Sequence, residues 1–118
     1  MLNVAELYRL GHDGAGRRRA LEQAEGGAKG ALRYATVTAL ANLDLEENEG
    51  DRAVERFRSL LSHEDQYLAQ QAHLDLAGAL EHLQRKEEAA AVYVDFLARW
   101  SDGKTADEVR RRQAEGAG

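Results

Sequence analysis

Apolar side chains recur every three or four residues along two neighbouring stretches between His73 and Ser101. The stripe of the first stretch consists of Leu74, Ala77, Ala79, Leu80 and Leu83, and that of the second consists of Ala90, Val92, Tyr93, Phe96, Leu97 and Trp100. This spacing is typical of α-helices that bury one face. The polar link 84–86 is so short that the second helix must fold back beside the first. The pattern therefore predicts a helix hairpin.

The hairpin also matches a known repeat pattern without a gap. The matching positions are His73, Leu76, Ala77, Leu80, Ala89, Tyr93, Phe96 and Ser101. With them the stretch resembles the tetratricopeptide repeat, a helix–turn–helix unit of about 34 residues. His73 and Phe96 depart from the residues usual in that family, and the closing proline is absent. The resemblance implies stacked hairpins that bind other proteins.

The pattern recurs along the chain with a longer period, because a shift of 36 residues superposes Ala5 on Ala41 and Ala41 on Ala77. The same shift groups Val4 with Leu40 and Leu76, Leu21 with Phe57 and Tyr93, and Ala24 with Leu60 and Phe96. A small residue at the repeated alanine lets two helices approach closely. The alternative is a chance match within a bundle rich in alanine and leucine.

A chain of 118 residues is the size of one domain. Because it has no proline and no continuous β-branched or aromatic run, strands are not expected. We expect an all-α fold, in which antiparallel helix hairpins stack as a short right-handed α-solenoid of about three repeats and about six to seven helices, as the resemblance implies. The predicted domain spans 1–115, with repeats at about 1–29, 30–65 and 66–101, a capping helix at 105–115 and a disordered tail at 116–118.

The first predicted repeat contains several glycines. Gly11, Gly14 and Gly16 predict a loop after a short first helix, because each glycine costs about 1 kcal/mol relative to alanine inside a helix. A second helix is expected from about Arg17 to Glu25. This end of the chain is expected to be looser than the rest, or to be completed by a partner chain.

Later helix ends are marked by capping residues. After a helix from Ala31 to about Glu47, a turn places Asp51 as the cap of the next helix, whose stripe continues to Leu61. Residues 62–65 form a polar link. Thr105, with a glutamate three residues later, has the spacing of a capping box and predicts the start of the last helix.

Charge and composition limit the classes of function. A net charge of −5 argues against a nucleic-acid partner, and the arginine runs 17–19 and 110–112 are expected on solvated helix surface. No cysteine is available for a disulfide or for a thiolate zinc site. No apolar run approaches the length of a membrane span, so no membrane insertion is expected. We expect a soluble cytoplasmic protein, or a periplasmic or membrane-associated one if the chain is a fragment of a longer protein.

Candidates for chemistry are few. His63, Glu64 and Asp65 are contiguous, so their side chains point in different directions and do not form a metal site. His73 and His82 are nine positions apart, which places them on opposite faces of a helix, with one of them against a neighbouring helix. The sequence therefore predicts no catalytic residue, no metal site and no cofactor.

The resemblance implies that the first helix of each repeat lines a concave face that grips a peptide or a helix. Carried over position by position, this face consists of Thr38, Asn42, Leu45 and Glu46, then Gln71, Leu74, Asp75, Gly78, Glu81 and His82, with Leu2, Glu6 and Arg9 from the first repeat. Only Asn42 matches the family's clamp for a terminal carboxylate, and acids occupy much of the rest. A ligand with an apolar stripe and some basic residues fits better. The alternative is that these side chains only solvate the helix.

These observations favour a non-catalytic adaptor or scaffold that binds another protein. A second hypothesis is a self-associating structural subunit, in which a second copy covers the apolar edges and forms a homodimer. Residues 93–112 also resemble the ends of repeat domains in bacterial envelope-assembly proteins, and the excess of arginine over lysine is typical of a GC-rich bacterial genome. A helical-bundle enzyme or metal protein is the third hypothesis, and the residue inventory disfavours it.

Overall fold

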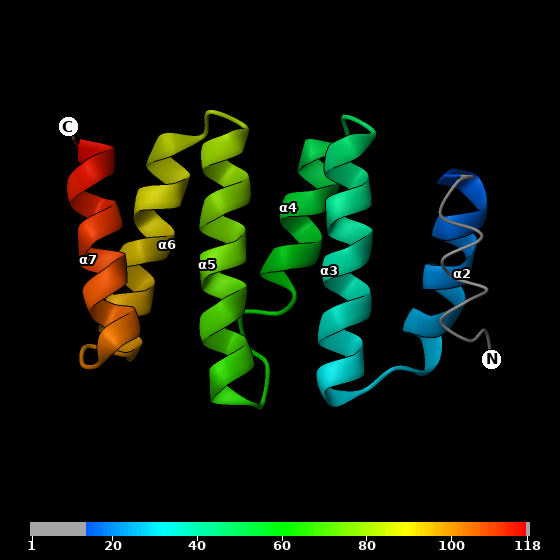
Figure 1. Cartoon of the computed structure of the whole chain (residues 1–118), viewed down its shortest axis with the longest axis horizontal. Helices are drawn as coiled ribbons and strands as arrows, with labels where there is room; N and C mark the ends of the chain where they lie inside the picture. The colour runs from blue at the N-terminus through cyan, green and yellow to red at the C-terminus, as the bar shows by residue number, and fades with distance from the viewer. Residues whose placement is uncertain (1–13, 118) are drawn as a thin grey trace. The chain divides into compact units, whose positions relative to one another are not determined.

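The structure, a computed structural model, describes residues 14–117, and these residues form six α-helices and no strand (Figure 1). The helices are α2 (Gly14–Gly27), α3 (Gly30–Glu46), α4 (Gly50–Arg58), α5 (Gln66–His82), α6 (Lys86–Arg99) and α7 (Lys104–Ala117). The all-α class is thereby confirmed. The predicted helix before Gly11 lies outside the described residues. Within 14–117 no helix is long and apolar enough to cross a membrane.

The chain divides into two compact units, with the boundary inside α4. Unit 1 holds α2, α3 and α4 as far as Arg56, and unit 2 begins at Phe57 and holds α5, α6 and α7. These two units do not coincide with the three repeats expected at 1–29, 30–65 and 66–101. The division into three repeats and their stacking as a right-handed solenoid stay predictions.

A period of 36 residues is present in the order of the helices along the chain. The helices α4 and α6 begin at Gly50 and Lys86, and α3 and α5 begin at Gly30 and Gln66. The two starts of each pair are 36 residues apart, and α3 and α5 have the same length, 17 residues. The spacing inferred from the repeated alanines is therefore also the spacing of helix starts.

The turns that follow α3 and α5 share one backbone conformation. Each contains a residue with positive φ, Asn48 at 62° and Gln84 at 63°, which lie 36 positions apart. In each turn the next N–H donates to the carbonyl five residues earlier, at 2.7 Å after α3 and at 2.8 Å after α5. A left-handed residue with this type of bond ends a helix and satisfies its last carbonyl groups. The two hairpins therefore turn in the same way, without glycine.

The helix α2 begins earlier than the sequence predicted. Gly14 and Gly16, expected in a loop, lie in its first turn, so the predicted start at Arg17 is wrong. Gly16 is buried. Packing therefore outweighs the weak helix propensity of glycine at this end.

Two predicted caps are wrong, because the helices begin before them. The helix α4 begins at Gly50, so Asp51 lies in its first turn, where its carboxylate still interacts favourably with the helix dipole. The helix α7 begins at Lys104, so Thr105 lies within it. Residues 116 and 117 are also helical rather than disordered, and Gly118 lies outside the described residues.

The segment between α4 and α5 holds a cap that the sequence did not identify. The helix α4 ends at Arg58, and Leu60 in the following turn is nevertheless fully buried. Asp65, assigned to a polar link, caps α5, because its Oδ1 accepts hydrogen bonds from the backbone N–H groups of Tyr67 at 2.9 Å and Leu68 at 3.2 Å. Such caps stabilise a helix by about 1 kcal/mol.

The repeated alanines Ala41 and Ala77 are both 0% exposed. Because α5 packs along α6, Ala77→Trp is expected to overpack this contact and to destabilise unit 2 by about 1–3 kcal/mol or more. Thermal melting measures the effect. The neighbouring Gly78→Ala is the matched control, since an added Cβ there meets nothing within 4 Å. Equal melting of Ala77→Trp and wild type would contradict the role of this alanine.

Candidate functional site

A cluster of aromatic side chains fixes α6 against α5 in unit 2. The fully buried Phe96 ring lies 6.0 Å from the His73 ring and 5.0 Å from the Trp100 ring. His73 Nδ1 lies 2.7 Å from the carbonyl oxygen of Ala69, and its Nε2 lies 2.7 Å from Asp95 Oδ2. His73 is thus the histidine expected against a neighbouring helix, and its contacts set the position of α6.

The second face of α6 packs against α7 and forms a groove with it. The groove has a volume of about 500 Å³. It is lined by Glu81 from α5, by Lys86, Ala89, Ala90, Tyr93 and Val94 from α6, and by Arg112, Gln113, Glu115 and Gly116 from α7. Its apolar part includes Val94, which is 61% exposed. The groove therefore offers an apolar surface between two helices.

A network of polar contacts centred on Tyr93 joins the helices around the groove. The Tyr93 hydroxyl donates to Glu81 Oε1 at 2.7 Å. Burial and this hydrogen bond raise the pKa of Tyr93. Burial alone would lower the pKa of Arg112, but its contacts with Tyr93 and Glu108 outweigh that effect and raise it. Tyr93 is therefore a neutral hydrogen-bond donor at neutral pH, and it ties the end of α5 to the groove.

Three polar side chains that line the groove have no hydrogen-bond or ion-pair partner among the described residues. Within residues 14–117, the side chains of Lys86, Gln113 and Glu115 make no hydrogen bond and no ion pair. The other charged side chains of the groove are held, Glu81 by Tyr93 and Arg112 by Glu108 at 3.1 Å. The groove thus combines a fixed polar framework with side chains that are available to a ligand.

The predicted binding residues lie on two helices, four on α3 in unit 1 and six on α5 in unit 2. The described members are Thr38, Asn42, Leu45, Glu46, Gln71, Leu74, Asp75, Gly78, Glu81 and His82, while Leu2, Glu6 and Arg9 lie outside the described residues. On each helix they form one stripe, because they recur at three- and four-residue spacing.

Most members of the predicted stripes remain on the surface. Asn42, Glu46, Gly78 and His82 are exposed, and the other members are half-buried. The Thr38 hydroxyl donates to backbone carbonyls of its own helix. Of the ten residues, only Glu81 lines the groove. Whether the stripes bind a partner stays a prediction.

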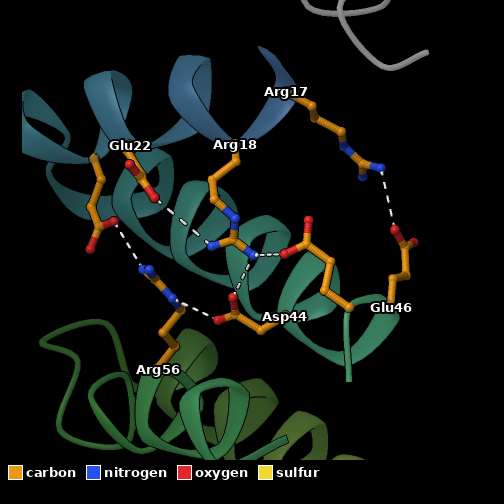
Figure 2. A network of polar contacts seen from close by, with 8 residues as sticks. Arg17, Arg18, Glu22, Asp44, Glu46 and Arg56 are labelled. Carbon is orange, nitrogen blue, oxygen red and sulfur yellow. Dashed lines mark hydrogen bonds and ion pairs between the residues drawn. The ribbon is translucent and has the colours of Figure 1, made fainter. Parts of the chain in front are cut away.

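A second polar site lies in unit 1 around Asp44, whose side chain is 0% exposed (Figure 2). Arg18 Nη2 donates to Asp44 Oδ1 and to Glu47 Oε2, each at 2.7 Å. Arg56 donates through Nε to Asp44 Oδ2 at 2.9 Å and through Nη1 to Glu25 Oε2 at 3.1 Å. The carboxylate of Asp44 therefore joins α2, α3 and α4 as far as Arg56.

The outer contacts of this network are weaker (Figure 2). Arg17 Nη1 lies 3.8 Å from Glu46 Oε2, and the two side chains are 37% and 62% exposed. Arg18 Nη1 is buried and has no hydrogen-bond partner among residues 14–117, and Glu22 Oε1 lies 3.9 Å from it. The hydrogen bond to Asp44 is the main cause that raises the pKa of Arg18. The guanidinium of Arg18 is therefore charged and fixed in place.

Neither polar site was predicted from the sequence. The arginine runs were expected on solvated surface, but Arg18 is only 16% exposed and binds Asp44, and Arg112 packs against Tyr93. That assignment is wrong for these two residues. A signal was available in the 36-residue period, which places the acidic Asp44 where the later hairpin has Leu80. A charged residue at a core position requires a partner of opposite charge.

A comparison of the chain with protein-family models gives no match, and comparisons with curated proteins and with solved structures give none either. Among the described residues, no three His, Cys, Asp or Glu side chains gather as metal ligands would. The resemblance to the tetratricopeptide repeat stays a prediction. The class that the structure defines is an all-α protein with helix hairpins of a common turn geometry.

Proposed function

We propose that this chain is a non-catalytic protein–protein interaction module, which acts as an adaptor or scaffold. The observation that carries the proposal is the groove between α6 and α7, whose lining includes the exposed Val94. Within residues 14–117, the Lys86 and Glu115 side chains in this lining have no hydrogen-bond or ion-pair partner. Exposed apolar surface with a polar rim is typical of a site that another protein covers. The ligand gains apolar burial at Val94 and polar contacts at the rim.

The predicted face on α3 and α5 is a second surface for the same function, and Glu81 belongs to both. Glu81 is not a suitable position for a test of binding, because its carboxylate accepts the hydrogen bond of the buried Tyr93. Substitution there would disturb the fold as well as the surface. Val94 is more suitable, since its side chain is largely exposed and its loss leaves the core intact.

Site-specific photo-crosslinking tests the proposal. With p-benzoylphenylalanine in place of Val94, the expected result in a lysate of the source organism is crosslinking to one discrete protein. Excess unlabelled wild-type chain should suppress it. The control carries the same photoreactive residue in place of Tyr67, which is 67% exposed at the start of α5 and does not line the groove. The same products from both positions, or none from Val94, would contradict the proposal.

A further inference from the structure

We infer that the occupant of the α6–α7 groove is an amphipathic helix of a partner protein, with an apolar stripe, acidic side chains on one flank and basic side chains on the other. The inference rests on the proposed function and specifies the partner of that same site. It follows from the shape of the groove and from the signs of its unengaged charges.

The shape of the groove suits a helix. Its two walls are the helices α6 and α7, which pack against each other in unit 2 (Figure 1). A third helix packs into the furrow between two packed helices and offers them one apolar stripe. Ala89 and Ala90 in the groove are small, so the backbone of an incoming helix can approach closely. An extended strand would need a sheet edge, and the described residues contain no strand.

The charges of the groove require both signs on the ligand. Lys86 belongs to α6 and Glu115 to α7, so the unpaired charges of the two walls have opposite signs, while Arg112 on α7 is paired with Glu108. Within residues 14–117 the side chains of Lys86 and Glu115 have no partner. A helix in the groove satisfies both if it presents a carboxylate toward α6 and a cation toward α7. A ligand with basic residues alone would satisfy Glu115 and repel Lys86. The ligand expected for the predicted stripes on α3 and α5 has an apolar stripe and some basic residues. The groove instead favours a ligand that carries acidic residues on one flank and basic residues on the other.

Three designed helical peptides with the same apolar stripe test the inference. One has an acidic and a basic flank, one has two acidic flanks and one has two basic flanks. In fluorescence anisotropy, wild-type protein is expected to bind the mixed peptide about fivefold more tightly than either of the others, which is the usual strength of exposed ion pairs. The preference should decrease with added salt.

Charge reversals on the protein give the matched comparison. Lys86→Glu should shift the preference to the basic peptide, and Glu115→Lys should shift it to the acidic peptide. The double variant Lys86→Glu with Glu115→Lys should prefer the mixed peptide again. The peptide should then bind in the opposite direction along the groove, because the charges of the two walls are exchanged. Glu87→Lys is the control, because Glu87 is exposed on α6 and does not line the groove, and it should keep the wild-type preference.

The outcomes separate this inference from the proposed function. Equal binding of all three peptides, or no shift in the single variants, would overturn the inference and leave the proposed function in place. No binding of any peptide by any variant would count against both. A chain whose mass doubles with concentration, and which Lys86→Glu returns to a monomer, would show that a second copy covers the groove, and the separate partner would be rejected.

Discussion

Asp44→Ala is expected to destabilise unit 1 by about 3–5 kcal/mol, which is the usual cost of removing one partner from a buried ion pair. The carboxylate of Asp44 is 0% exposed, and both of its oxygens accept from arginines that are only 16% and 20% exposed. Without Asp44, the guanidinium groups of Arg18 and Arg56 would lose their shared buried counterion and have little access to water. Urea denaturation, together with amide hydrogen exchange of α2 and α3, measures the loss.

Two further variants test whether the loss of stability in Asp44→Ala comes from the buried charges. Glu46→Ala removes only the contact with Arg17 at 3.8 Å between solvent-accessible side chains, so it should cost less than about 1 kcal/mol. The triple variant Asp44→Leu, Arg18→Val and Arg56→Val replaces the charged residues by those found 36 positions later, Leu80, Val54 and Val92. Apolar replacement of a whole buried ionic cluster is often neutral or stabilising, so this variant should regain most of the stability. An Asp44→Ala protein as stable as Glu46→Ala would contradict the role of the network.

Phe96→Ala is the second substitution with a large expected effect, a loss of about 3–5 kcal/mol from the stability of unit 2. Phe96 is fully buried, and its ring contacts the His73 and Trp100 rings that hold α6 on α5. Removal of the ring leaves a cavity as well as a loss of apolar burial. Trp100 fluorescence during urea denaturation reports the transition, because its ring lies beside the deleted one.

The control for Phe96 is its neighbour Val94. Since the Val94 side chain is 61% exposed, Val94→Ala should change the free energy of unfolding by no more than about 0.5 kcal/mol. If Phe96→Ala also stayed within about 1 kcal/mol of wild type, the aromatic cluster would not be the contact that fixes α6. The position of the groove would then need a different explanation.

The parts of the fold that the sequence predicted are those that depend on local periodicity. The helix class, the hairpin around 84–86 and the buried alanines follow from apolar spacing, since burial of a stripe repeats with the helix turn. Helix ends were predicted less well. Gly14 and Gly16 favour a loop by propensity but lie in a helix, and Thr105 matches a capping box but is preceded by one more helical residue.

The candidate site was predicted only in part, because it depends on residues far apart in the sequence. Glu81 was selected from its position on α5, but its bond to Tyr93 joins two helices. The partners Arg18 and Asp44 are separated by 26 positions, and no local pattern connects them. The groove itself arises from how α7 packs on α6, which apolar spacing within either helix does not specify.

Backbone NMR of the full chain during titration with the mixed-flank helical peptide shows whether a helix binds in the α6–α7 groove. The expected result is that the perturbed amides cluster at residues 86–94 and 112–116, on the two walls of the groove. Perturbations confined to α3 or to residues 71–78 of α5 would contradict the assignment of the groove as the binding site. The partner would then lie on the face that the sequence alone predicted.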